Sequence, residues 1–231
     1  MGTSGTTAFS PSNGEILLYA LEMCGIRSTA VLQEHMFSGR MAMNMLLSRW
    51  SNQGPNLWNI ELVSVPLIQG QATYSVDPSV VMILDAYVTT NPGTANTFDR
   101  LIFPISRTEY ASYPNKTLQD PPTVFWFDRL LSPTVTLWQV PDSTNTYVLN
   151  YYAVQQNQDA NLNSAQTPAI PYRWLDAFST GIAARLSVTY APDKAPGLKA
   201  LADEAWKIAA DQDTESVPLF IQPGCGSYFI R

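Results

Sequence analysis

The sequence contains little of the chemistry on which most enzymes depend. Its 231 residues include one histidine, His35, and two cysteines, Cys24 and Cys225, which lie almost a whole chain length apart. The sequence therefore predicts no histidine-dependent triad, zinc site or disulfide framework. A phosphate-binding loop is not expected either, because the glycines at Gly224 and Gly226 lack the lysine and the strand-to-helix setting. We expect no cofactor and no metal, and we interpret His35 as a surface or half-buried helix residue.

Charged residues are also scarce. They make up 14% of the chain, against about 25% in an ordinary soluble domain, and the formal net charge is −6. The hydrophobic share of 45% and the aromatic share of 11% exclude a long disordered chain and a coiled coil. The negative charge disfavours tight binding to DNA phosphates. An exterior with so few charges is typical of proteins that associate with copies of themselves or with partners.

The sequence lacks signals for export and membrane insertion. The first seven residues, MGTSGTT, contain neither the basic region nor the apolar core of a secretory signal, and no run of about 18 apolar residues follows. We therefore expect a soluble or assembled protein with no membrane partner, and a flexible N-terminus over residues 1–14.

Hydrophobic residues recur at helical spacing in two parts of the chain. Residues 15–53 predict two helices separated by a short break, with Ser28 or Thr29 as the N-cap of the second. Residues 171–190 and 198–211 predict two more.

Neither of these helix pairs can bury a sizeable core alone. We therefore expect residues 15–57 and 168–214 to pack together as one helical bundle.

Residues 58–167 show a different pattern, in which short runs rich in β-branched and aromatic residues alternate with proline, glycine, asparagine and aspartate. This alternation predicts an antiparallel sheet or small sandwich. The expected strands are 58–65, 72–76, 81–90, 98–105, 123–130, 134–140 and 147–154, with an irregular or helical turn over 107–113. The predicted fold class is α+β, with an antiparallel β module inserted into the helical bundle.

The last residues, 215–231, mix apolar and aromatic side chains with prolines and glycines and show no periodicity. Such a segment cannot bury its apolar side chains by itself. We therefore expect an extended C-terminal tail that docks on another protein.

Two other hypotheses remain open. A hydrolase needs two converging carboxylates. Asp203 and Glu204 point in different directions from a helix, and the series Asp211, Asp213 and Glu215 lacks the glycine and distal glutamate of a calcium loop, which favours a solvated helix end.

A carbohydrate-binding module would need exposed, coplanar aromatic side chains, whereas core or interface packing is the favoured interpretation. The candidate aromatic residues are Trp126, Trp138, Tyr147, Tyr151 and Tyr152.

Five short segments occur in an order that resembles the podophage head-to-tail adaptors, also called head completion, DNA stabilisation or tail tubular A proteins. The segments are 101–110 (LIFPISRTEY), 113–116 (YPNK), 121–129 (PPTVFWFDR), 137–142 (LWQVPD) and 171–177 (PYRWLDA). The resemblance covers about residues 98–231, and the N-terminal helices match mainly in layout. Gln139 stands where the family pattern has proline.

The resemblance implies a structural protein without enzymatic activity, located in the virion at the head-to-tail junction. Twelve copies would form a ring below the portal, around a channel through which double-stranded DNA passes without sequence-specific binding. The C-terminal tail would reach the portal protein, and the opposite face would receive the tail nozzle protein. A channel that lets DNA slide should be lined by acidic or neutral polar residues.

On this basis two sets of residues are candidates for contacts. The expected portal contacts are Leu219, Phe220, Ile221, Tyr228 and Phe229. The charges expected to form pairs within the β module or to face a neighbouring subunit are Arg107, Glu109, Lys116, Asp128 and Arg129. The alternatives are a phage-borne cell-wall hydrolase and a carbohydrate-binding module.

Overall fold

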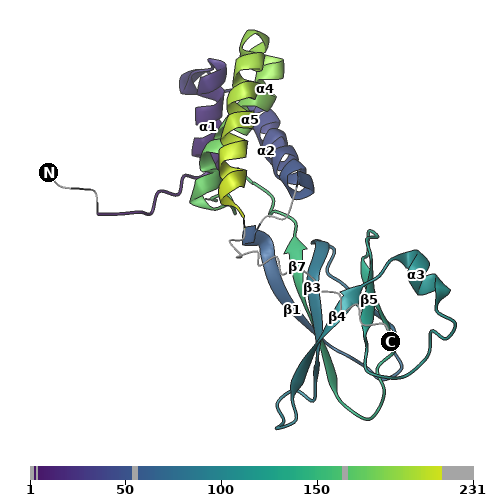
Figure 1. The fold of residues 1–231 in the computed structure, drawn as a ribbon. Helices are drawn as coiled ribbons and strands as arrows, with labels where there is room; N and C mark the ends of the chain where they lie inside the picture. Colours follow the sequence, from purple (N-terminus) through teal and green to yellow (C-terminus); the bar gives the residue numbers. More distant parts are fainter. Residues whose placement is uncertain (1–2, 4, 54–56, 163–165, 215–231) are drawn as a thin grey trace, which may run out of the picture.

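The structure is a computed structural model that describes residues 3, 5–53, 57–162 and 166–214. Within these residues the fold is mixed α+β, with five α-helices and a curled seven-stranded sheet (Figure 1). Figure 1 shows the four long helices gathered at one end and the strands at the other. The predicted α+β class is confirmed, and the expected portal contacts lie outside the described residues.

The four long helices share one hydrophobic cluster, which includes Leu17, Met43, Trp50, Phe178 and Ile182. The helix α4 contacts each of the other three, so it lies at the centre of the group. The helices are α1 (Asn13–Cys24), α2 (Gln33–Gln53), α4 (Leu175–Tyr190) and α5 (Ala195–Gln212).

The start of α2 corrects two predictions. Neither Ser28 nor Thr29 caps this helix, because both lie in the separate 3-10 turn Ser28–Ala30. The backbone N–H of Leu32 instead donates to Nδ1 of His35 (2.9 Å). The His35 ring packs edge-on against Tyr190, with ring centroids 4.8 Å apart, and the side chain is buried. His35 is therefore a buried residue that fixes the first turn of α2, and the surface or half-buried interpretation is wrong.

The strands lie close to their predicted positions, in the spatial order β1-β7-β3-β4-β5-β6-β2. Their bounds are β1 (Ile60–Pro66), β2 (Thr73–Ser75), β3 (Val80–Thr90), β4 (Phe98–Pro104), β5 (Val124–Asp128), β6 (Thr134–Trp138) and β7 (Tyr147–Gln155). One neighbouring pair, β4 and β5, runs parallel, so the prediction of a wholly antiparallel sheet is wrong. The connection between these strands contains the helix α3 (Arg107–Ser112) and is long enough for the crossover that parallel strands require.

The sheet encloses a second hydrophobic cluster, separate from that of the helices. It includes Val88, Ile102, Phe125, Leu137 and Tyr151, which come from five different strands. Because side chains alternate between the two faces of a strand, the opposite face of the sheet is left to solvent.

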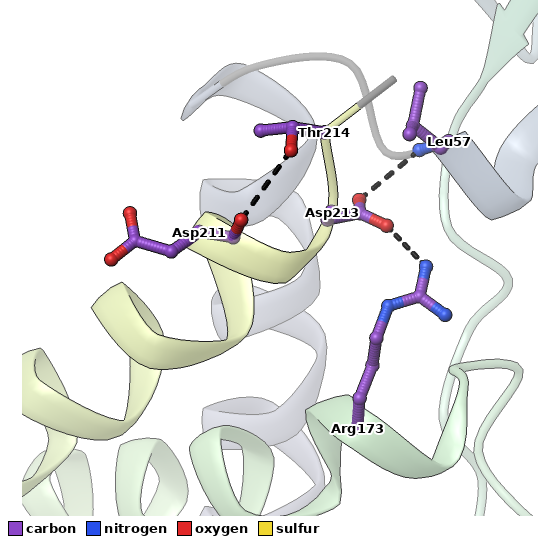
Figure 2. Close-up of polar contacts among 5 residues, drawn as sticks. All are labelled: Leu57, Arg173, Asp211, Asp213 and Thr214. Carbon is purple, nitrogen blue, oxygen red and sulfur yellow. Dashed lines mark hydrogen bonds and ion pairs between the residues drawn. The ribbon is translucent and has the colours of Figure 1, made fainter. Parts of the chain in front are cut away.

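Asp213, directly after α5, ties the helices to the start of the sheet (Figure 2). Its carboxylate forms an ion pair with Arg173 and accepts a hydrogen bond from the backbone N–H of Leu57 (3.3 Å), just ahead of β1. Only 4% of the Asp213 side chain is exposed. The prediction that this acidic series is a solvated helix end is therefore wrong for Asp213.

A second tie lies where the chain returns from β7 to the helices. Nδ2 of Asn157 donates to the carbonyl oxygen of Leu47 and to Oγ of Ser51, both at 3.3 Å. Asn44 of α2 holds Ala160, because Nδ2 of Asn44 donates to the Ala160 carbonyl and its Oδ1 accepts from the Ala160 N–H, both at 2.9 Å. Polar groups of α2 thus hold the segment that follows β7.

Candidate interaction surfaces

Lys116 donates hydrogen bonds to backbone carbonyls at the end of α3, and it has no carboxylate partner among the described residues. Its Nζ donates to the carbonyl oxygens of Ala111 (3.2 Å) and Tyr113 (3.0 Å), and it lies 5.7 Å from the ring centroid of Tyr110. Glu109 lies in the first turn of α3, where its backbone N–H donates to the Ser106 hydroxyl (3.1 Å).

Three other charged residues of the predicted set also have no ion pair among the residues that the structure describes, namely Arg107, Asp128 and Arg129. The ion pair found there joins Arg173 to Asp213. The structure therefore does not show the expected charge pairs within the sheet. The alternative role of these residues, at a contact between subunits, stays a prediction.

Trp126 and Trp138 are covered by aromatic side chains of the α3 region. The ring of Tyr113 stacks on that of Trp138, with centroids 4.1 Å apart and an interplanar angle of 16°. The ring of Tyr110 packs against that of Trp126 at 5.7 Å. Both tryptophans are half-buried, so neither is the fully exposed ring that a sugar-binding platform would favour.

The other three aromatic candidates lie on different faces of the sheet. Tyr147 and Tyr151 are buried in the sheet core, and Tyr152 points to the outer face with 41% of its surface exposed. The five side chains that the sequence grouped together therefore do not form one binding surface.

Among the described carboxylates, those of Glu15 and Asp77 have a pKa below the ordinary value. Hydrogen bonds from Ser12 lower the pKa of Glu15, and hydrogen bonds from Ser79 lower the pKa of Asp77. Both shifts are opposite to the raised pKa that a general acid needs. No group of three or more metal-ligating side chains occurs within the described ranges, and none of the helices there is long and apolar enough to cross a membrane.

A groove with a volume of about 820 Å³ lies between α2, α4 and α5. Its floor is apolar, with Leu46, Trp50, Gly181 and Trp206 among the lining residues. Its charged residues are the cations Arg49, Arg185, Lys199 and Lys207 and one acid, Asp203. We call this the basic groove.

The basic groove has an excess of positive charge, with four cations and one carboxylate. None of these cations forms an ion pair within the part of the chain that the structure describes. Arg185 donates to the carbonyl oxygen of Met45 (3.2 Å), but its buried Nε has no hydrogen-bond partner among the described residues. Burial lowers the pKa of the Arg185 guanidinium, and the neighbouring charge of Arg49 lowers it further.

A second groove, of about 570 Å³, lies beside α1 and the start of α4. Its carboxylates are Glu15 and Asp176, and its one cation, Arg173, is already paired with Asp213. Three aromatic side chains stand out from its rim, namely Phe9, Tyr19 and Tyr172, with 69%, 54% and 71% of their surfaces exposed. We call this the acidic aromatic face.

The outer face of the sheet carries a row of side-chain hydrogen bonds across four strands. Ser64 donates to Oδ1 of Asn150 (2.6 Å), and Nδ2 of Asn150 donates to Thr89 (2.9 Å). The Thr89 hydroxyl in turn donates to Oδ1 of Asp99 (2.5 Å). The exposed apolar side chains on the same face are Leu62, Leu101, Phe103 and Tyr152.

Sequence reasoning missed the two grooves and the outer face of the sheet. It also missed a row of exposed apolar side chains on α2, although Phe37, Met41 and Met45 recur every four residues in the sequence. The two grooves had no such signal, because each combines helices from both ends of the chain. No protein-family model matches the chain, and no curated protein matches it at a significant level.

Proposed function

We propose that this protein is a structural adaptor of a tailed phage, which forms a ring that joins the portal to the tail and surrounds the DNA channel. In this proposal the four long helices form the body of each subunit, and the sheet is a module inserted between them. Residues 215–231, which lie outside the described residues, are the proposed portal-docking tail. The basis is the order of the segments that resemble the podophage adaptors, together with the surface of the described residues.

The observation that carries the proposal is the amount of apolar surface that the chain leaves uncovered. Nineteen large hydrophobic side chains are exposed in the described part of the chain, on the helices and on the sheet alike. Scattered single exposed hydrophobics are normal, but aligned sets such as those on α2 and on the outer face of the sheet are typical of protein contacts. An adaptor needs several such surfaces, because it contacts its own copies, the portal and the tail.

The two alternatives have less support. A cell-wall hydrolase needs two convergent carboxylates, one of them with a raised pKa, and neither groove provides this arrangement. A carbohydrate-binding module needs exposed tryptophans, whereas Trp126 and Trp138 are covered by tyrosines.

The direct test is the mass of the purified protein by light scattering, alone and mixed with the portal ring encoded in the same genome. We expect a stoichiometric complex with about one copy per portal subunit. A protein that ignores the portal at every mixing ratio would refute the proposal, and binding to peptidoglycan or polysaccharide would then be measured.

A further inference from the structure

The basic groove and the acidic aromatic face lie on opposite sides of the same helix. At 3.6 residues per turn, Gly181, Arg185 and Val188 of the groove point about 180° away from Asp176 and Ser179 of the acidic face. Two different surfaces of opposite charge are thus presented in opposite directions from α4.

The two surfaces are also complementary in chemistry. The rings of Phe9 and Tyr172 are in edge contact, with centroids 6.5 Å apart, and both project from the surface. The basic groove offers an apolar floor that includes Trp50 and Trp206, with cations around it that can lie over aromatic rings or pair with carboxylates.

The acidic groups remain available for such a contact. Asp176 is exposed, and its carboxylate has no partner among the described residues. Glu15 uses Oε2 to accept hydrogen bonds from Ser12, whereas Oε1 makes none within the described ranges.

The occupant of the basic groove should be acidic. The groove contains four of the chain's 13 lysines and arginines, in a protein of formal net charge −6, and none of the four has an ion pair among the described residues. The buried Arg185 Nε without a partner, beside the like charge of Arg49, would be stabilised by a negative group at the surface of an incoming protein.

We propose that the basic groove of one copy receives the acidic aromatic face of a second copy of this chain. The contact joins two different patches, so each copy still has one free groove and one free acidic face. A head-to-tail contact of this kind generates a closed ring when the rotation per subunit divides the circle, and an open filament otherwise. The inference rests on the proposed ring, for which it names the contact between neighbours.

The test uses three variants of the full chain. In the groove variant, Lys199→Glu and Lys207→Glu reverse two exposed charges, and in the face variant Asp176→Arg reverses one. The control, Arg27→Glu with Arg100→Glu, changes the net charge as much as the groove variant at exposed positions outside both surfaces. Circular dichroism and urea unfolding verify that each variant is folded.

Self-association is measured by sedimentation velocity at low ionic strength over a wide range of concentrations. We expect the wild type and the control to associate, and the dissociation constant of each interface variant to rise at least about tenfold, since like charges then face each other. A mixture of the groove and face variants should form a one-to-one complex that neither variant forms alone, because the intact groove of one meets the intact acidic face of the other. This complex should not grow into larger species as the wild type does, since both of its remaining surfaces carry reversed charges. Added salt should weaken the wild-type contact.

Three outcomes overturn the inference: a wild type that stays monomeric throughout, self-association that the interface variants share unchanged, and a mixture of these variants that forms no one-to-one complex. These outcomes are separate from failure of the adaptor proposal. If the wild type joins the portal and the groove variant still self-associates, the groove contact is refuted and the adaptor role stands. If the wild type self-associates through the groove but ignores the portal, the groove contact stands and the adaptor role is refuted.

Discussion

The start of α1 shows how a single carboxylate can define a helix end. The hydroxyl of Ser12 accepts a hydrogen bond from the Glu15 N–H (3.3 Å), while Glu15 Oε2 accepts from the Ser12 N–H (2.7 Å). This reciprocal arrangement is a capping box, and it satisfies backbone donors that the first turn of a helix leaves free. The hydrogen bonds favour the ionised form of Glu15, which is why its pKa lies below the ordinary value of 4.5.

The capping box predicts a specific pH dependence. Because the folded pKa is depressed, the stabilisation by Glu15 is present above the unfolded pKa and is lost as the pH falls through the folded pKa. Glu15→Gln should therefore lower the urea midpoint at pH 7, and the difference from wild type should shrink as the pH falls below about 4.5. The control is Glu22→Gln in the same helix, whose side chain makes no hydrogen bond in the described ranges. Equal effects of the two substitutions at all pH values would contradict the prediction.

The ion pair of Arg173 with Asp213 should contribute more to stability than a surface pair, because the aspartate is almost fully covered. In Arg173→Ala, Asp213 keeps the hydrogen bond from Leu57 but loses its cation, and we expect a loss of about 1–3 kcal/mol in the free energy of unfolding. Urea unfolding would measure it. Arg100→Ala, at an exposed position on β4, should change stability by less than about 0.5 kcal/mol. A loss no larger than that of Arg100→Ala would show that the pair contributes little.

At the scale of elements, close helix contact depends on two glycines. A Cβ added to Gly39 of α2 would lie 2.4 Å from both Cδ atoms of Leu17 in α1, and Leu17 is completely buried. A Cβ on Gly181 of α4 would lie 2.6 Å from Cδ2 of Leu46 in α2. The spacing of α1, α2 and α4 therefore requires glycine at these positions.

Two alanine substitutions in helices should have opposite effects. Gly39→Ala should destabilise the protein by about 1–3 kcal/mol, since Leu17 has no space into which to move. A Cβ added at Gly197 in α5 would meet no atom within 4 Å. Gly197→Ala should therefore stabilise the protein by about 0.4–1 kcal/mol, because alanine lowers the conformational entropy of the unfolded chain. Thermal or urea unfolding of both variants checks the pair, and stabilisation by Gly39→Ala would show that α1 and α2 are not packed as described.

At the scale of the whole molecule, the chain combines a self-contained helical core, a self-contained sheet core and uncovered apolar surface on both. Two separate cores allow the tail to be removed without loss of the fold. Deletion of residues 217–231, which lie outside the described residues, should leave a folded protein that no longer joins the portal. Circular dichroism and portal mixing measure the two effects, and unimpaired joining would refute the tail assignment.

The proposed ring permits a second test at this scale. We expect the residues that face the DNA channel to be acidic or neutral polar, because a basic wall would hold the phosphates and slow the passage of DNA. An experimental structure of the ring with a continuous circle of lysines and arginines in the channel would contradict this.

The sequence by itself determined the elements of this protein, because hydrophobic periodicity and turn residues are local properties of the chain. The four long helices, the seven strands and the turn at α3 all lie near their predicted positions. The limit of local reasoning is visible at Ser28, where a suitable capping residue was present but the helix began at Gln33.

Only the tertiary structure decided which distant residues meet. The parallel pairing of β4 with β5, the burial of Asp213 against Leu57 and Arg173, and the collection of four cations in one groove each join segments that are far apart in the chain. Such contacts depend on how whole elements pack, and no single segment carries a pattern that specifies them. The two grooves therefore emerged only when helices from the two ends of the chain were placed side by side.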